Sequence, residues 1–253
     1  HLSIRRQRQM CIRDSSKADG SRLMRGKLES NELSQLQSVR NFTGERSAQY
    51  WLTPFLGALV AGEAKKQDQV LKLLERIDNQ LSLAIVSQRE ASFAILSGDE
   101  VSMRSIGSVI EELKEPSGTR FEHYWFQKLE YILWRERNRF GKYDAVKLAA
   151  YRITSKNSIE HVHPQREEFG VELDKEHLDS FGNLVLLSPG ENSSYSNQRV
   201  GKKREDFKGK PRYDSLKLAH IFSGKDGMEW SESAIGLHLS LIHISEPTRP
   251  LYI

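Results

Sequence analysis

The chain has 253 residues, of which 38 are lysine or arginine, 34 are aspartate or glutamate and one is cysteine. A single cysteine excludes a disulfide framework and zinc sites built from cysteine pairs. No run of apolar residues is long enough to span a bilayer, so we expect no membrane segment and a cytoplasmic protein of one or two domains.

The two ends of the chain resemble translated laboratory DNA. Residues 5–14 can be encoded by a transposase adapter from sequencing-library preparation, and residues 239–244 by the complementary strand of the same oligonucleotide. Two ends of one natural protein would not be opposite strands of one oligonucleotide. We therefore treat residues 1–15 and 239–253 as adapter-derived and expect the remainder to be a fragment of a longer protein.

Removing these ends changes what the charge implies. Five arginines and two acidic residues lie in them, which leaves 33 of the 38 basic and 32 of the 34 acidic residues. A chain so nearly balanced has no overall positive charge that would indicate a nucleic-acid partner. The single cysteine, Cys11, lies in the first of these ends as well.

Residues 16–140 are predicted to form a mostly helical region. Apolar residues recur at three- and four-residue steps within residues 70–85, 101–113 and 121–139. This spacing is typical of amphipathic helices that bury one face. The sequence Pro-Ser-Gly at residues 116–118 interrupts the pattern between the last two of these stretches.

A strand–strand–helix unit is predicted after the helical region. Ile159 and Val162 are strand-type residues, residues 184–187 form a short apolar run, and residues 191–207 are polar and compatible with a helix. The sequence therefore predicts an α+β protein, in which the helical region is followed by a small ββα domain over residues 141–238.

Three short motifs of this unit resemble those of the HNH, or ββα-metal, nucleases. They are Ile-Glu-His-Val-His-Pro-Gln at residues 159–165, Gly-Asn-Leu-Val-Leu-Leu at residues 182–187, and an asparagine-rich helix start at residues 192–197 that Lys202 follows. In this order they resemble in particular the C-terminal domain of the GmrSD-type, modification-dependent restriction endonucleases. The resemblance implies a phosphodiester hydrolase that nicks or cleaves foreign or modified DNA in prokaryotic phage defence.

Hydrolysis of a phosphodiester needs a base to activate water, a cation for the developing negative charge and a stabilised leaving oxygen. A histidine titrates in the right range to serve as the base, and the resemblance gives this role to His161. It also implies that Asn183 holds the loop and orients His161 through a backbone or ring contact. Lys202 is expected to meet a phosphate near the cut, and His163 is expected to be a bystander.

The resemblance also implies a divalent metal, held by Glu160 and Asn192. Asn197 is an alternative to Asn192, because the serines that lie between them suit a helix cap equally well. Two such residues give the metal few protein ligands, so water and phosphate oxygens would complete its coordination. That arrangement suits Mg²⁺, or Mn²⁺, better than Zn²⁺.

A basic segment ending at Lys217 follows the motifs and is the one strongly basic stretch of the sequence. We expect it to bind DNA phosphates, because neutralising phosphates gives affinity that does not depend on sequence. A solvated helix face is the alternative interpretation. The residues expected to contact DNA are Arg199, Lys203, Arg204, Lys208, Lys210 and Arg212.

Two other functions stay open at this point. The basic segment could bind nucleic acid without cleaving it, and metal-dependent nicking separates that possibility from an endonuclease. A ββα site could also cleave RNA, as in a toxin or effector, because its chemistry does not distinguish the sugars.

In the family a ParB-like, nucleotide-hydrolysing half precedes this domain. No Gly-Gln-Gln-Arg-type motif of that half is found in the sequence, so we expect that partner to be missing from the fragment.

Overall fold

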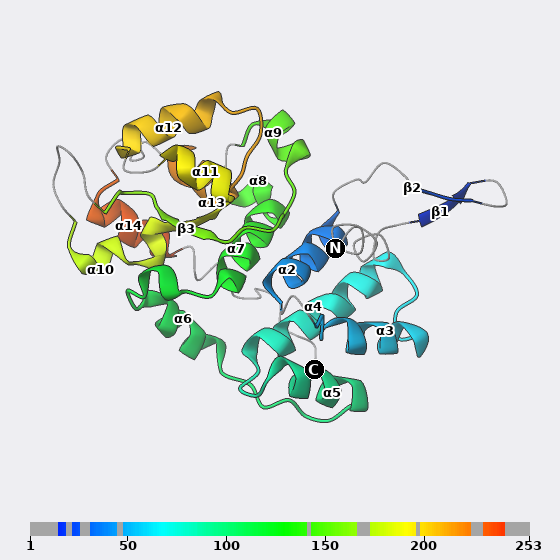
Figure 1. Cartoon of the computed structure of the whole chain (residues 1–253). Coiled ribbons are helices and arrows are strands. Elements are labelled where there is room, and N and C mark those ends of the chain that lie inside the picture. Colours follow the sequence, from blue (N-terminus) through cyan, green and yellow to red (C-terminus); the bar gives the residue numbers. More distant parts are fainter. Residues whose placement is uncertain are drawn as a thin grey trace.

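The computed structural model of the chain describes residues 15–18, 22–25, 31–44, 48–140, 143–165, 173–195, 198–223 and 230–240 (Figure 1). A two-stranded antiparallel hairpin, β1 (Ser15–Ala18) and β2 (Arg22–Arg25), comes first. Helices then follow up to residue 150, and a second antiparallel pair of strands lies among the later helices. This arrangement confirms the predicted α+β fold.

The helical region contains short helices that begin at defined caps. Asn31 and Ser87 each accept a hydrogen bond from the backbone three residues on, which satisfies an N–H that the first helical turn leaves unpaired. Gly98 ends its helix in the left-handed conformation, which glycine adopts without strain. The helices are α2 (Glu32–Thr43), α3 (Leu52–Val60), α4 (Gln67–Leu83), α5 (Gln88–Ser97), α6 (Ile106–Lys114), η1 (Gly118–Arg120), α7 (His123–Arg135), α8 (Arg137–Phe140) and α9 (Ala145–Ala150).

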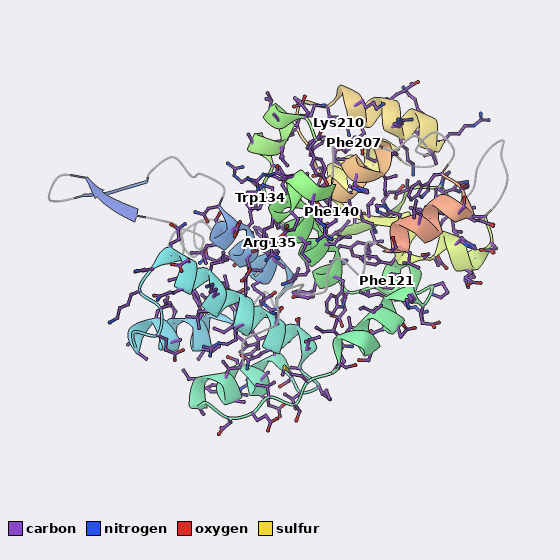
Figure 2. All side chains as sticks on the ribbon, turned by 180° about the vertical axis from the view of Figure 1, so that it is seen from behind. Phe121, Trp134, Arg135, Phe140, Phe207 and Lys210 are labelled. Carbon is purple, nitrogen blue, oxygen red and sulfur yellow. The ribbon has the colours of Figure 1, made fainter. Side chains whose placement is uncertain are left out.

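Helix α7 lies between the two halves of the molecule (Figure 1). It packs against α2 on one side, and against a later helix, α13 (Leu216–Ser223), and strand β4 (Leu184–Leu187) on the other. Nine of its thirteen residues are buried. Phe126 stacks on Phe181 at 4.5 Å between ring centroids. Phe121, labelled in Figure 2, lies just before α7 and meets the Phe181 ring edge-on at 5.3 Å.

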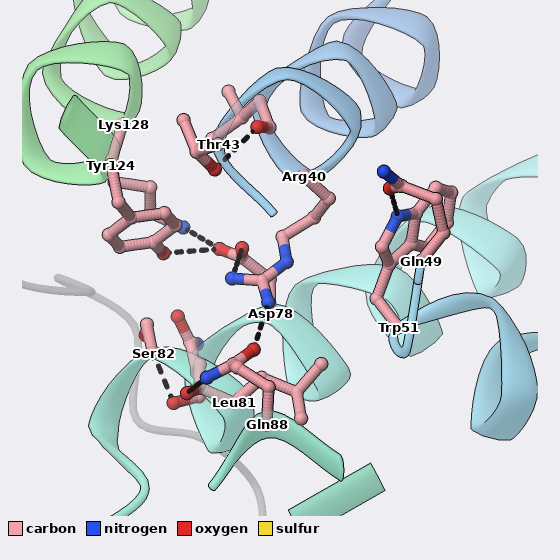
Figure 3. Close-up of polar contacts among 12 residues, drawn as sticks. Arg40, Thr43, Gln49, Trp51, Asp78, Leu81, Ser82, Gln88, Tyr124 and Lys128 are labelled. Atoms are coloured by element: carbon pink, nitrogen blue, oxygen red, sulfur yellow. Dashed lines mark hydrogen bonds and ion pairs between the residues drawn. The ribbon is translucent and has the colours of Figure 1, made fainter. Parts of the chain in front are cut away.

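A buried carboxylate joins four helices of the helical region (Figure 3). Asp78 of α4 is fully buried and accepts hydrogen bonds from Tyr124 at 3.0 Å, from Arg40 at 3.5 Å and from Lys128. Arg40 also donates to Gln88 of α5 at 2.7 Å. A buried charge is tolerated only when such partners compensate for lost hydration, so this cluster fixes α2, α4, α5 and α7 relative to one another.

The second sheet consists of β3 (Ser158–His161) and β4, paired so that Ile159 lies opposite Leu186 and His161 opposite Leu184. All four residues of β4 are buried. Leu184 and Leu186 belong to the core that contains α7, whereas Val185 and Leu187 pack with Tyr195, Phe207 and Trp230. Because side chains alternate along a strand, β4 separates two hydrophobic cores.

The remaining helices surround this pair of strands. They are α10 (Lys175–Leu178), η2 (Phe181–Asn183), α11 (Pro189–Tyr195), α12 (Val200–Gly209), α13 and α14 (Glu232–Leu239). The two predicted strands are present, but the single helix expected over residues 191–207 is two helices, α11 and α12. Helix α12 starts at Val200, which is buried and packs in the same core as Phe207. These apolar contacts position α12 independently of α11.

The carboxylate of Glu130 connects α7 to the first turn of α13. It is 3% exposed and accepts hydrogen bonds from the Leu216 N–H at 2.6 Å, the Ser215 hydroxyl at 2.5 Å and the Tyr151 hydroxyl at 2.7 Å. The N–H of Lys217 adds a fourth bond at 3.2 Å. A negative charge at a helix N-terminus is stabilising, so a residue of the helical region caps a helix of the predicted ββα domain.

Replacing Glu130 with alanine should destabilise the protein by about 3 kcal/mol, because two backbone N–H groups and two hydroxyls would lose a charged acceptor. Urea unfolding at pH 7, followed by circular dichroism, measures this loss. Glu111→Ala is the control: Glu111 is exposed and pairs only with Lys114 on its own helix, so less than about 1 kcal/mol should be lost. Equal losses in the two variants would contradict the capping role.

Candidate active site

His161 ends β3 and is buried except for 7% of its surface. Its Nε2 lies 3.4 Å from Oδ1 of Asp179, a residue that directly follows α10. Among the described residues no protein group bonds the other ring nitrogen, Nδ1. Burial lowers the pKa of His161, and the Asp179 carboxylate opposes that shift. Among the described residues, the ring of His161 is therefore held through Nε2 alone.

Asn183 fixes the loop that follows His161. Its side-chain oxygen accepts the N–H of His163 at 2.9 Å and the indole N–H of Trp230 at 3.0 Å, and its amide donates to the Leu178 carbonyl at 2.9 Å. Its backbone oxygen accepts the N–H of Val162 at 2.8 Å. The contacts of Asn183 with Val162 and His163 are made to the backbone beside His161, and among the described residues no hydrogen bond joins Asn183 to the His161 ring. Asn183 is fully buried, so it acts by holding the loop.

Gly182 and His163 both lie close to Asn183, and the structure accounts for each of them. A side chain at Gly182 would place its Cβ only 2.6 Å from the Ile235 backbone oxygen, so glycine lets η2 approach α14 closely. His163, the expected bystander, is buried and its Nδ1 lies 3.1 Å from the Pro164 carbonyl. His163 thus turns toward its own loop.

Glu160 is held by a lysine that was expected to contact DNA. The Lys203 ammonium donates to Oε1 of Glu160 at 2.9 Å and to the His161 carbonyl at 2.7 Å. Lys203 is only 2% exposed, because it shares the inward face of α12 with Val200 and Phe207. The sequence placed Lys203 on the DNA-binding surface, and the structure differs: its charge is used internally. Burial lowers the pKa of Lys203, and Glu160 opposes that shift.

The carboxylate of Glu160 suits a hard divalent cation. Lys203 occupies Oε1, and the other oxygen, Oε2, has no protein partner among the described residues. An oxygen donor of this kind is what Mg²⁺ or Mn²⁺ prefers. The predicted second ligand, Asn192, lies on α11, and α11 packs against β3. The Asn192 side chain and the alternative ligand, Asn197, lie outside the described part of the structure.

The predicted phosphate-binding lysine, Lys202, is exposed on α12, next to the buried Lys203. Its ammonium lies 2.9 Å from Asp206, one helical turn away, and this exposed pair contributes little to stability. No contact joins Lys202 to His161 or Glu160 in the described residues. Its position leaves the ammonium accessible to a phosphate, whereas Lys203 is not accessible.

The other basic residues that were expected to contact DNA differ in how exposed they are. Arg199, Lys208 and Arg212 are exposed. Arg204 is half-buried and its Nε donates to the Phe222 carbonyl at 3.0 Å. Lys210, labelled in Figure 2, is half-buried. It is paired with Glu191 and lies 4.6 Å from the Tyr195 ring centroid. A cleft of about 370 Å³ runs beside this segment, and its lining includes Lys147, Arg204, Lys208 and Tyr213.

Lys217, which the sequence grouped with the basic surface, is buried. It donates to the Phe181 and Leu184 carbonyls at 2.5 and 2.6 Å, on either side of Asn183, and lies 4.0 Å from the Phe181 ring centroid. Burial lowers its pKa to about 7. The apolar residues that surround Lys217 in α13 were the signal that it faces inward.

A second set of metal-compatible side chains lies away from Glu160. Atoms of Asp174, His177 and Glu232 lie within 4.8 Å of one another, where α10 meets α14. None of the three was predicted. Asp174 is the N-cap of α10 and also bonds the His177 ring at 2.7 Å, so helix capping accounts for the contact between these two residues without a metal.

Comparison with protein families gives the class of protein first. A family model of restriction endonucleases matches residues 111–238, which are 128 of the 253 residues. The model is that of the GmrSD restriction endonucleases, C-terminal domain, and the chain belongs to this family. The matched segment starts within α6 and includes α7 together with the whole second sheet.

Other comparisons add no relative. No curated protein and no solved structure matches the chain. Among the described residues, no helix is long and apolar enough to cross a membrane. The predicted family is thus confirmed, while the roles predicted for individual residues stay predictions.

Proposed function

We propose that the chain is a metal-dependent DNA endonuclease of the HNH type that cuts foreign or modified DNA. The observation that carries the proposal is the arrangement at the end of β3. His161 is bonded through Nε2 to Asp179, and neither its Nδ1 nor Oε2 of the adjacent Glu160 is bonded by another described residue. Hydrolysis of a phosphodiester requires a base and a cation, and His161 and Glu160 offer the base and a ligand for the cation.

In the proposed reaction, Nδ1 of His161 takes a proton from a water molecule. The water oxygen forms a bond to phosphorus while the bond from phosphorus to the leaving sugar oxygen breaks. The leaving oxygen keeps the electron pair of that bond and takes a proton from solvent water. Glu160 and Asn192 would hold Mg²⁺ or Mn²⁺, which when bound neutralises the charge that builds up on the phosphate. Lys202 would meet the same phosphate or its neighbour. Asn183 keeps the loop in place from inside the fold.

Contact with the DNA backbone is proposed for the exposed cations of α12 and its flanks. Arg199, Lys208 and Arg212 are exposed, and the half-buried Arg204 and Lys210 add positive charge beside them. Lys203 is left out of this surface because it is buried. A ParB-like half as partner remains a proposal that the family resemblance alone supports.

Replacing His161 with alanine should lower the rate of plasmid nicking at least about a hundredfold, because general-base catalysis is lost. Gel assays with supercoiled plasmid, and with RNA of matched length, measure the rate and test the sugar preference. His177→Ala, at a more exposed histidine, should nick at the wild-type rate. Wild-type nicking by a folded His161→Ala protein would remove the base assignment. A wild-type protein that binds DNA but never nicks would favour the binding-module alternative.

The metal prediction compares two glutamates. Nicking should require Mg²⁺ or Mn²⁺ and stop in chelator. Glu160→Gln should raise the metal concentration for half-maximal rate about tenfold or more, since a charged ligand is lost. Glu232→Gln should leave that concentration unchanged. The reverse result would move the metal to the cluster of Asp174, His177 and Glu232.

The DNA surface is tested by salt dependence. Changing Arg199, Lys208 and Arg212 together to alanine should flatten the slope of log affinity against log salt, by about 0.9 for each phosphate that the variant no longer neutralises. Fluorescence anisotropy with a short duplex measures it. The control triple variant Lys65→Ala, Lys72→Ala and Arg89→Ala removes the same charge from exposed sites of the helical region. Equal slopes for both triple variants would mean that Arg199, Lys208 and Arg212 do not contact DNA.

A further inference from the structure

We propose that Asp179 is a positioning residue that fixes the proton on His161, and that Gly118 of the helical region fixes Asp179. The three groups form a chain of contacts. Oδ1 of Asp179 lies 3.4 Å from Nε2 of His161, and the Asp179 backbone oxygen accepts the N–H of Gly118 at 2.9 Å. The inference rests on the proposed function in giving His161 the role of base.

Asp179 selects one of the two neutral forms of the His161 ring. An ionised carboxylate only accepts hydrogen bonds, so the nitrogen that faces it must carry the proton. That nitrogen is Nε2, and the remaining nitrogen, Nδ1, then presents a lone pair. A base needs that lone pair toward water, and a ring with the opposite tautomer would present a proton there instead. Asp179 therefore acts through His161 and need not touch the substrate.

Gly118 leaves the space that the Asp179 side chain occupies free of a Cβ. Its φ of 58° lies in the left-handed region, which side chains disfavour. A Cβ built on Gly118 would lie 3.0 Å from Oδ1 and 3.1 Å from Cγ of Asp179, which is closer than ordinary contacts. Any side chain at residue 118 would displace the same oxygen that faces His161. The N–H of Asp179 is held as well, by the Lys175 carbonyl at 3.0 Å.

The contact makes the catalytic end of β3 depend on a turn before α7. Gly118 lies outside all three motifs, in η1 between α6 and α7. The chain also offers a matched control. Gly98 has a similar φ of 77°, but a Cβ there would meet nothing within 4 Å. Gly98→Ala therefore introduces the same backbone strain as Gly118→Ala without the contact on a functional side chain.

The tautomer can be measured directly. The chain is labelled with ¹⁵N-histidine, the His161 signal is assigned with a His161→Gln variant, and ring ¹⁵N shifts are recorded at pH 8, where an ordinary imidazole is neutral. Wild type should show protonated Nε2 and unprotonated Nδ1. Asp179→Ala and Asp179→Asn should lose that preference, and Gly118→Ala should lose part of it, whereas Gly98→Ala should match wild type. The nicking rate should fall about tenfold to a hundredfold in the Asp179 variants.

Two results would overturn the proposal: a wild-type His161 that carries its proton on Nδ1, or an unchanged tautomer in both Asp179 variants. An equal effect of Gly118→Ala and Gly98→Ala would remove the role of Gly118. Circular dichroism confirms that each variant is folded before its spectrum is interpreted. Because the ring shifts do not require DNA or metal, they stand even when no nicking is found, and that outcome would count against the proposed function alone.

Discussion

The hydrogen bonds that the Glu130 carboxylate accepts are the interaction on which the rest of the structure depends. The second sheet has two strands of four residues each, and so small a sheet is not stable by itself in water. It is held because α7 packs on β4 and because Glu130 of α7 caps α13. Helix α13 then carries Lys217 to the two carbonyls beside Asn183. The helical region therefore supports the candidate site and is more than a neighbour to it.

Sequence reasoning found the parts of the site that are local in the chain. The helical spacing, the two strands, and the motif that contains Glu160, His161 and Asn183 are all readable from neighbouring residues. The positions of Lys202 and Lys203 were harder to predict, because a basic run shows which residues are charged but not which face of a helix they occupy. Lys203 stands three residues after Val200 and four before Phe207, the spacing of one buried face. That pattern was present in the sequence, but the charge masked it.

Other parts could not be read from the sequence in any local way. Asp179 lies between motifs, and its contact with His161 exists only because α10 and β3 are brought together by folding. The sequence indicated a break at Pro-Ser-Gly, residues 116–118, and in the structure η1 begins at the last of these residues. Nothing in that tripeptide indicates that Gly118 contacts Asp179, a residue far along the chain. The domain boundary predicted at residue 141 also crosses a continuous core, since Leu184 and Leu186 pack with α7.

The burial of β4 on both faces has a consequence for strand register. In a strand with one buried and one solvent-exposed face, a slip of one residue exposes apolar side chains and is therefore unfavourable. In β4 all four residues are apolar and buried, so hydrophobicity alone would tolerate a slip of β4 along β3, which would change the residue that lies opposite His161. The discrimination must come from directional bonds: those of Asn183 to the His163 N–H and of Lys203 to the His161 carbonyl. Polar bonds, rather than hydrophobic packing, thus fix the pairing of His161 with Leu184.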